Sequence, residues 1–340
     1  MSRPSGARGL WFVAPRAVEV RESDLPDPGP DEAVVRTAFS GISPGTELLA
    51  YRGEIDDSVA LDDTLPALSG RFSYPFRYGY SCVGYVERGD AFAEGTPVFA
   101  FQPHQDRFVV AAGDAIEIHG LEPRTATLFP LVETALQVSL DAKPARGTFV
   151  VVAGLGVVGL LVALLLQRGG ARVLGSEPQT WRRRVAQSLG IEAVAPGDLD
   201  AGVAQATDGL GVPLLVEVSG NPSALADGLR VLAHEGTALV VSWYGTKPVT
   251  LPLGAEFHRR RLTIRSSQVS TIPARLAGEW TRERRRQVAL ELITELPLDA
   301  LATHEFPFTE AETAFRHVDE APADGRGGPT ARTPRRQDRP

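Results

Sequence analysis

Residues 149–177 read FVVVAGLGVVGLLVALLLQRGGARVLGSE, in which an apolar run meets a glycine pattern and then further apolar residues. The first run is typical of a buried parallel strand, and the residues after the glycines favour a helix that returns across the sheet. Gly154 permits a tight turn, Gly156 lets a pyrophosphate approach the backbone, and Gly159 lets the helix pack closely on its strand. The segment predicts a dinucleotide-binding unit, and the alternative is a glycine-rich turn in another parallel α/β sheet.

The start of this helix is the predicted site of the cofactor phosphates. Unpaired N–H groups and the positive end of the helix dipole favour an anion at a helix N-terminus. The residues expected to bind the cofactor here are Gly154, Leu155, Gly156, Val157, Val158 and Gly159.

The acidic residue after the second strand bears on which dinucleotide is bound. A carboxylate accepts hydrogen bonds from a ribose 2′-hydroxyl and repels a 2′-phosphate, so Glu177 favours NAD. Arg182 and the two arginines after it leave NADP open, although an arginine run is more often a solvated helix face. We therefore expect NAD, with Arg182 as a further cofactor contact.

The composition of the chain limits the classes of partner. Its 340 residues, 43% of them hydrophobic, are enough for two domains with cores of their own. A net charge of -7 gives no general attraction to nucleic acid or to anionic lipid, so a small-molecule substrate is expected. Cys82 is the only cysteine, which excludes an intramolecular disulfide and any multi-cysteine zinc cluster. The N-terminal residues lack a signal-peptide core, and we expect a cytoplasmic protein without membrane association.

Strand and helix patterns divide the chain into two parts. Short strands punctuated by glycine and proline precede residue 120 and indicate a β-rich domain. The middle of the chain alternates strands with helices, which is the signature of a parallel sheet covered on both faces. Residues 281–296 predict an amphipathic helix that Pro297 ends. The expected strands are residues 34–38, 81–87, 97–101 and 107–111, and then 149–153, 171–176, 213–218, 237–242 and 262–266.

Four further segments carry a resemblance to a known family: SGISPGTELLAYRG at 40–53, YGYSCVG at 78–84, PHQDRFV at 103–109 and GAEFHRRRLTIRSSQVS at 254–270. With the glycine pattern, they make the chain similar to the medium-chain dehydrogenase/reductase superfamily. Within it, the chain resembles the zinc-free branch typified by bacteriochlorophyllide a dehydrogenase.

The resemblance implies an α/β architecture, a Rossmann doubly wound parallel sheet accompanied by a β-rich GroES-like catalytic domain. Relatives often form oligomers, so a homodimer is an open expectation. The implied boundaries are 1–125 for the first part of the catalytic domain, 126–268 for the Rossmann domain and 269–324 for the return to the catalytic domain.

Zinc-binding members of this family carry metal ligands in a Gly-x-Cys segment and a Gly-His-Glu segment. This chain has Gly41-Ile42-Ser43 and Gly79-Tyr80-Ser81 at the corresponding places. Neutral hydroxyls do not match the thiolate, imidazole and carboxylate groups that hold zinc, so no catalytic zinc is expected. Hydrogen-bond donors and general acids must then polarise a substrate carbonyl.

Tyr80 is the first candidate for a catalytic group, because its phenol can donate a hydrogen bond to a substrate oxygen. The alternative is a tyrosine that packs at the domain edge. Ser43 and Thr46 lie in the segment that carries a hydroxyl proton relay in zinc-binding relatives, or else Ser43 shapes the turn at Pro44. His104 is a candidate for proton transfer near neutral pH, with a surface-loop histidine as the alternative.

The remaining candidates are expected near the cofactor. Glu133 is either an acid close to the expected nicotinamide or a charge at a helix N-terminus, and we favour the helix role, with Thr134 as a cofactor contact. Ligands lie at the carboxyl ends of parallel strands. The other expected contacts are Ser219, Gly220, Ser242, Trp243 and Tyr244, together with His258, whose three following arginines either bind an anion or form a solvated turn.

These residues predict a zinc-independent, NAD-dependent oxidoreductase that interconverts a secondary alcohol and a ketone on a specialised metabolite. One alternative is a zinc-free quinone or enoyl reductase that uses NADPH, which Glu177 disfavours. An alternative of another class is a dinucleotide-binding protein without turnover. Residues 325–340 contain three prolines and five arginines without apolar alternation, so we expect them to be disordered and to lack the family's closing strand.

Overall fold

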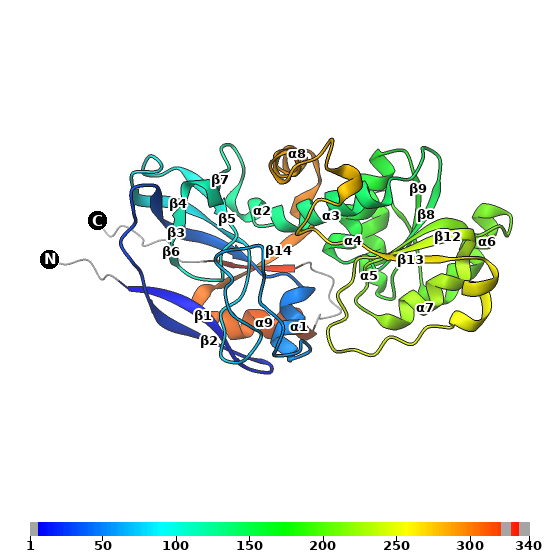
Figure 1. Ribbon diagram of the computed structural model, residues 1–340, viewed down its shortest axis with the longest axis horizontal. Coiled ribbons are helices and arrows are strands. Elements are labelled where there is room, and N and C mark those ends of the chain that lie inside the picture. Colours follow the sequence, from blue (N-terminus) through cyan, green and yellow to red (C-terminus); the bar gives the residue numbers. More distant parts are fainter. Residues whose placement is uncertain (1–5, 321–327, 333–340) are drawn as a thin grey trace. The chain divides into compact units, whose positions relative to one another are not determined.

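The computed structural model describes residues 6–320 and 328–332, which fold as two compact units (Figure 1). The first unit contains the described residues up to Pro130 together with those from Leu290 onward. The second unit contains Leu131–Ala289.

Both unit boundaries lie later in the chain than the predicted boundaries at 125/126 and 268/269. A buried contact accounts for the later second boundary. Arg285 is ion-paired with Glu133 at 3.1 Å, in the helix that opens the second unit. This contact keeps the residues between 269 and 289 with the second unit.

The described part of the second unit is built on a six-stranded parallel sheet with the order β10-β9-β8-β11-β12-β13. The chain order reverses between β8 and β11, and in such sheets ligands lie outside the carboxyl ends of the strands at that point. The five strands predicted here are confirmed, and β10 was missed because three residues show no periodicity. The strands are β8 (Phe149–Ala153), β9 (Arg172–Ser176), β10 (Glu192–Val194), β11 (Val212–Glu217), β12 (Leu232–Val240) and β13 (Thr263–Ser266).

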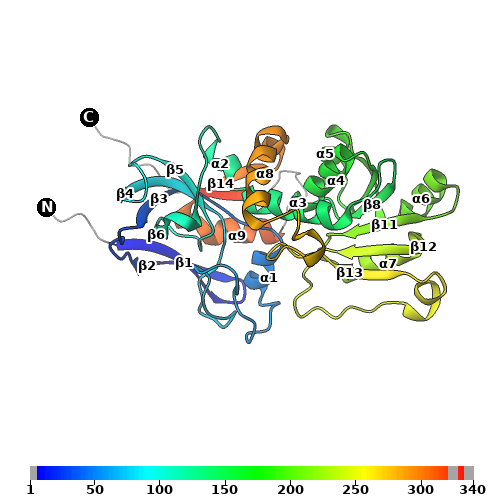
Figure 2. The ribbon, with the colours of Figure 1, turned by 45° about the horizontal axis from the view of Figure 1, so that its top comes forward.

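Helices cover this sheet on both faces, as the sequence predicts for a doubly wound fold. Figure 2 shows α4 and α5 on one side of the sheet and α7 on the other. Helix α4 has apolar residues on nearly all sides, which suits its continuous burial from Gly159 to Leu164. The helix predicted at 281–296 is confirmed as α8. The helices of this part are α3 (Phe129–Ala142), α4 (Val157–Arg168), α5 (Thr180–Ser188), α6 (Leu199–Thr207), α7 (Pro222–Val231) and α8 (Arg282–Glu295).

The described part of the first unit contains a seven-stranded sheet, mostly antiparallel, and a separate β1-β2 hairpin. The sheet order is β14-β15-β3-β4-β5-β7, with β6 paired to β3. The four strands predicted before residue 120 are confirmed as β3, β4, β5 and β6. The strands are β1 (Gly6–Ala14), β2 (Ala17–Asp24), β3 (Glu32–Gly41), β4 (Cys82–Gly89), β5 (Pro97–Ala100), β6 (Arg107–Ala111), β7 (Ala115–Glu117), β14 (Ala302–Pro307) and β15 (Gly328–Arg332).

Three helices and several short helical turns complete the described chain. The helices are α1 (Thr46–Arg52), α2 (Pro123–Ala126) and α9 (Ala311–Glu320). The turns lie at Ala112–Asp114, Pro196–Asp198, Leu253–Phe257, Ala274–Leu276, Leu298–Ala300 and Phe308–Glu310.

Strand β15 differs from the disorder predicted for residues 325–340. Gly328–Arg332 pairs in parallel with β14 and antiparallel with the end of β3 at Phe39–Gly41. A ladder uses backbone N–H and C=O groups, so a segment without apolar alternation can still occupy a place between two strands. The prediction is therefore wrong for these five residues, and the rest of the predicted tail lies outside the described residues.

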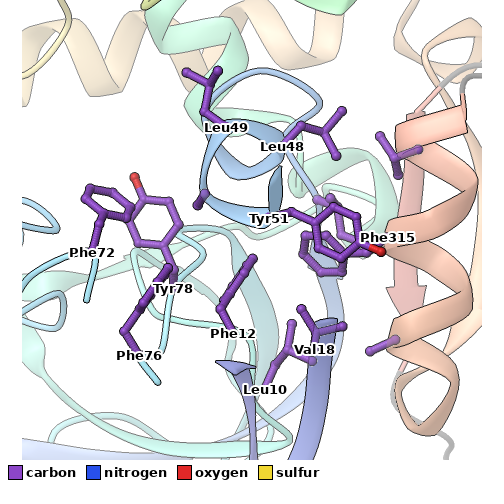
Figure 3. Close-up of a cluster of buried hydrophobic side chains, with 14 of the residues drawn as sticks. Leu10, Phe12, Val18, Leu48, Leu49, Tyr51, Phe72, Phe76, Tyr78 and Phe315 are labelled. Carbon is purple, nitrogen blue, oxygen red and sulfur yellow. The ribbon is translucent and has the colours of Figure 1, made fainter. Parts of the chain in front are cut away.

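Aromatic side chains form the core of the first unit between the hairpin, α1 and α9 (Figure 3). Phe12 stacks on Phe76 with ring centroids 5.2 Å apart and meets the edge of Phe315 at 5.3 Å. Tyr51 of α1 packs on the same Phe315 at 5.4 Å. Aromatic pairs at these separations stabilise a core beyond the area they bury, so α1 is anchored firmly to the C-terminal α9.

Within the described residues, the structure contains no helix with the length and apolar character needed to cross a bilayer. The longest described helices, α3 and α8, have 14 residues each. A span needs about 20 apolar residues.

Candidate active site and cofactor loop

Each glycine of the loop after β8 has a separate structural reason. Gly154 has a φ of 96°, and a Cβ there would lie 2.6 Å from the Ser219 Cα atom. A Cβ at Gly159 would lie 2.0 Å from the Gly154 carbonyl oxygen, so only glycine lets α4 approach the loop. A Cβ at Gly156 would meet nothing closer than an Arg182 nitrogen at 4.0 Å. The first and third glycines of the loop therefore leave no room for a side chain, whereas the second glycine borders open space.

The open glycine is also the N-cap of α4. Gly156 provides no side-chain acceptor for the N–H groups of the first turn, which Val157 and Val158 begin. These N–H groups and the helix dipole favour an anion at this position. The loop and the helix start have the form of a phosphate site, as the sequence predicts.

Glu177 anchors the same loop from the end of β9. Its Oε2 atom accepts a hydrogen bond from the Leu155 N–H at 2.9 Å, and its Oε1 atom accepts one from the Gln179 N–H at 2.9 Å. Arg182 lies 3.8 Å from Oε2, and its guanidinium group stacks over the Trp181 ring at 5.1 Å. An ionised carboxylate has about four acceptor sites, so Glu177 keeps acceptor capacity for a ribose hydroxyl.

A second buried carboxylate, which the sequence analysis missed, organises the loops after β11 and β12. Glu217 is fully buried and accepts hydrogen bonds from the Ser219 N–H at 2.8 Å and from the Tyr244 hydroxyl at 2.5 Å. Burial and the Glu217 charge raise the pKa of Tyr244. The Gly220 N–H donates to the Ser242 hydroxyl oxygen at 2.8 Å. Four predicted cofactor contacts thus form one network around Glu217.

Two other predicted contacts of the second unit are exposed to solvent. Trp243 is 43% exposed, and His258 is exposed at the end of a helical turn. Two of the arginines after His258 have carboxylate partners, Arg260 with Glu256 at 2.6 Å and Arg261 with Glu235 at 2.9 Å. Of the two alternatives for the arginines after His258, an anion site or a solvated turn, the solvated turn with ion pairs therefore explains Arg260 and Arg261.

Glu133 and Thr134 lie inside α3, after its first turn. Glu133 is buried against Arg285, which is itself only 2% exposed and also donates to Gln137 at 2.6 Å. Burial raises the pKa of Glu133, and the neighbouring arginines act in the opposite direction. Thr134 is half-buried. The contacts give Glu133 a role in a buried ion pair, which differs from the helix-terminus charge that the sequence favoured.

The first unit brings three predicted catalytic residues together. Tyr80 lies just before β4, and the side chains of Ser43 and Thr46 are close enough to its phenol to lower the phenol's pKa. Burial raises the pKa of Tyr80 well above its ordinary value, and the charge of Glu47 raises it further. The two hydroxyl partners act in the opposite direction. The phenol is therefore held in its protonated, hydrogen-bond-donating form.

His104 joins this cluster through Glu47, a residue that the sequence analysis missed. The His104 Nε2 atom lies 2.6 Å from the Glu47 Oε2 atom, and both side chains are almost completely buried. Glu47 also accepts a hydrogen bond from the Ser43 N–H at 2.9 Å. The surface-loop alternative for His104 is wrong, because its ring is 1% exposed. The sequence signal for Glu47 was a carboxylate directly after Thr46. An acidic residue at this place is also typical of an exposed first helical turn, so the signal did not reveal its burial.

The residues at the places of the family's zinc ligands have other partners. The Ser81 hydroxyl donates to the Thr127 carbonyl oxygen at 2.7 Å, the Ser43 N–H donates to Glu47, and the Tyr80 phenol lies beside the Ser43 side chain. In the part of the chain that the structure describes, no three His, Cys, Asp or Glu side chains gather as metal ligands. These neutral hydroxyls do not fit a zinc ion, which proteins hold with thiolate, imidazole and carboxylate groups.

Comparison with known proteins identifies the family. The family model described as zinc-binding dehydrogenase matches residues 157–292. The 2-desacetyl-2-hydroxyethyl bacteriochlorophyllide A dehydrogenase of Rhodobacter capsulatus is 28% identical over 91% of this chain and 93% of its own length. The chain is a medium-chain dehydrogenase/reductase. It is therefore an oxidoreductase.

Two further comparisons extend this assignment. The L-threonine 3-dehydrogenase of Bacillus subtilis is 30% identical over 57% of this medium-chain dehydrogenase/reductase, and the match spans about half, 54%, of that relative. An alcohol dehydrogenase of E. coli, solved with NADH, has a TM-score of 0.75 and 17% identity, and the match covers 96% of this chain and 99% of that one. The structural match confirms the predicted fold class.

Proposed function

We propose that this protein interconverts a secondary alcohol and a ketone with NAD and without a catalytic zinc ion. The observation that carries the proposal is the Tyr80 phenol, which lies beside the hydroxyl side chains of Ser43 and Thr46 where zinc-binding relatives carry ligands. A half-buried phenol that stays protonated can donate a hydrogen bond to a carbonyl oxygen. Such a donor stabilises the charge that develops on this oxygen during hydride transfer.

The reaction balances with these groups alone beside the cofactor. In the oxidative direction, the loop with Gly156 and Glu177 would hold NAD, which would supply the hydride acceptor for the carbinol carbon as the C=O bond forms. The proton of the substrate hydroxyl leaves through the hydroxyls of Thr46 and Ser43 to water, and Tyr80 donates its hydrogen bond to the new carbonyl oxygen. In the reductive direction, the same hydroxyls return the proton to the alkoxide.

The choice of NAD rests on Glu177. A buried carboxylate beside the second glycine of the loop accepts from a ribose hydroxyl and repels a 2′-phosphate. The glycine-capped start of α4 supplies N–H groups to the pyrophosphate. The NADH complex of the E. coli structural neighbour supports a dinucleotide at this fold.

The proposed substrate is a small specialised metabolite with a secondary hydroxyl group. The name of the Rhodobacter relative includes a hydroxyethyl group. This name supports a conversion of a hydroxyethyl group to an acetyl group. We further propose a cytoplasmic protein that acts on this metabolite without a nucleic-acid or membrane partner, as the net charge of -7 favours. A homodimer is part of the same proposal.

Arg182 favours a second candidate function, an NADPH-dependent quinone or enoyl reductase without zinc. Its guanidinium group is held over Trp181 within 3.8 Å of Glu177, a position that suits a 2′-phosphate. In this case the carbon that accepts a hydride belongs to a C=C bond or a quinone. The Tyr80 phenol then donates its hydrogen bond to the conjugated carbonyl.

Turnover by metal-stripped protein tests the proposal. The purified protein is treated with a chelator, its zinc content is measured, and a panel of aryl and alkyl secondary alcohols is offered with NAD or NADP. The proposal predicts NADH formation by zinc-free protein. Activity that returns only with stoichiometric zinc contradicts it, and NADPH oxidation with quinones or enones instead supports the second candidate.

A further inference from the structure

Glu47 is an ionisable side chain whose burial needs an explanation. It lies in the first turn of α1, where an acidic residue is ordinarily solvated, yet it is 0% exposed. A buried carboxylate is costly unless hydrogen bonds and a partner compensate for the lost water. An apolar side chain at this place would avoid that cost.

The contacts of Glu47 join two separate segments of the first unit. One carboxylate oxygen accepts from the Ser43 N–H at 2.9 Å, and the other lies 2.6 Å from the His104 Nε2 atom. The second ring nitrogen of His104, Nδ1, contacts the Ser40 hydroxyl at the end of β3. Both ring nitrogens of His104 therefore have hydrogen-bond partners, and the ring has a fixed orientation.

The His104 ring also determines where the segment with Tyr80 can lie. Gly79 has a φ of 113°, and a Cβ at this residue would lie 2.6 Å from the His104 Cδ2 atom. The backbone directly before Tyr80 therefore rests on the imidazole ring. Glu47 fixes Ser43 at one end of the cluster and, through His104, the backbone of Tyr80 at the other.

We propose that Glu47 and His104 are positioning residues that hold the Tyr80 hydroxyl beside Ser43 and Thr46. The inference rests on the proposed function, since it assigns the device that prepares Tyr80 for that reaction. Neither side chain needs to touch the substrate, because both are almost completely buried. Their effect passes through the backbone at Ser43 and Gly79.

The charge of Glu47 gives this arrangement a measurable signature. Glu47 and Tyr78 are the titratable groups beside the phenol, and the Tyr78 and Tyr80 ring centroids are 6.0 Å apart. After burial, the negative charge of Glu47 is the next cause that raises the pKa of Tyr80. Replacement of Glu47 by a neutral isostere therefore lowers this pKa while the shape of the cluster stays the same.

The experiment places 3,5-difluorotyrosine at position 80 of the full chain and records its single fluorine resonance against pH. The label is needed because the chain has six tyrosines and only position 80 should report. The phenol of 3,5-difluorotyrosine is also more acidic than that of tyrosine, so it titrates at a lower pH. Glu47→Gln removes the charge and keeps hydrogen-bonding atoms for Ser43 and His104. His104→Asn keeps the charge and removes the ring that supports Gly79. Asp106→Asn is the matched control, since this buried carboxylate in the same loop pairs with Arg8 at 2.8 Å.

The proposal predicts that the resonance titrates at a lower pH in Glu47→Gln than in the parent protein. In His104→Asn the resonance is expected to shift and broaden at neutral pH, and in Asp106→Asn to match the parent. An unchanged resonance in a folded Glu47→Gln protein, or an equal effect of Asp106→Asn, overturns the proposal. If Glu47→Gln does not fold, the His104→Asn spectrum decides in the same way.

This test needs no substrate, so its failure is distinguishable from failure of the proposed function. Absence of any turnover with a normal fluorine titration contradicts the proposed reaction and leaves the positioning role supported. Turnover with no effect of Glu47→Gln on the titration contradicts the positioning role alone.

Discussion

Glu177 accepts a hydrogen bond from the Leu155 N–H at 2.9 Å, so the acid after β9 holds the glycine loop after β8. The residue that favours NAD over NADP in the sequence is therefore also a structural part of the phosphate loop. If the proposed function is right, selection of the ribose and the shape of the phosphate site both depend on this one carboxylate. Substitutions at this position are expected to affect both.

Glu177→Gln should reduce the preference for NADH over NADPH by about tenfold, because one hydrogen bond to a charged group contributes about 1.5 kcal/mol. The amide no longer repels a 2′-phosphate, and one acceptor site is lost. Dissociation constants for both cofactors measure the effect. Glu192→Gln, at an exposed position of β10, is the control and should bind as the parent does. An unchanged preference in Glu177→Gln contradicts the selector role.

Two glycine substitutions in the same loop should have different effects, one on NADH binding and the other on folding. Gly156→Ala places a methyl group in open space, so the protein should fold normally but bind NADH more weakly. Gly159→Ala places a methyl group 2.0 Å from the Gly154 carbonyl oxygen and should lower the melting temperature or prevent folding. Thermal unfolding and NADH titration separate the two effects. Normal NADH affinity in Gly156→Ala argues against a phosphate at this loop.

Tyr80→Phe should lower kcat by about 100-fold or more, the range of a lost general acid or hydrogen-bond donor. NADH affinity should stay the same, because the phenol lies in the first unit and the cofactor loop in the second. Steady-state kinetics on the first alcohol that turns over measure the effect. Tyr85→Phe on β4 serves as the control. Full turnover by Tyr80→Phe is the result that removes Tyr80 from the mechanism.

Alkaline pH should destabilise the fold through its buried tyrosines. Burial and the Glu217 charge raise the pKa of Tyr244, so the folded state keeps a proton that the unfolded state loses above about pH 10. This contribution to stability is present below the unfolded pKa and is lost as pH rises toward the folded value. Urea unfolding between about pH 9 and pH 11 should show a falling free energy of unfolding, less steep in Tyr244→Phe. Identical slopes for both proteins contradict this assignment.

Removal of divalent metals should leave the protein intact. Ser43, Tyr80 and Ser81 have hydrogen-bond partners within the protein, so no fold element depends on a zinc ion at their position. Dialysis against a chelator is expected to change neither the melting temperature nor NADH affinity. A fall in either value that zinc restores, and magnesium does not, contradicts the zinc-independent account.

Periodicity and glycine chemistry made much of the fold predictable. The glycine pattern, the parallel strands and helix α8 follow from apolar repeats that a single sequence displays, and the structure confirms them. The cluster of Tyr80, Ser43 and Thr46 followed from motif position, because segments that carry ligands in relatives converge in the fold.

Buried charged residues were the part that the sequence did not reveal. Glu47 and Glu217 each occur next to apolar residues, and Arg285 lies within a run of arginines, but charged residues at such places are ordinarily solvated. Their burial depends on partners distant in the chain, such as His104 for Glu47 and Glu133 for Arg285. Strand β15 was missed for a related reason, since its place depends on β14 and β3 rather than on its own side chains.

A pair of titrations, NADH and NADPH, tests the central claim most directly. The quenching of tryptophan fluorescence reports binding, and Trp243 beside the Glu217 network is one of four tryptophans in the chain. The account predicts saturable binding of NADH with clearly weaker binding of NADPH. Preferential NADPH binding contradicts the role of Glu177 and favours the reductase, and binding of neither cofactor contradicts the dehydrogenase itself.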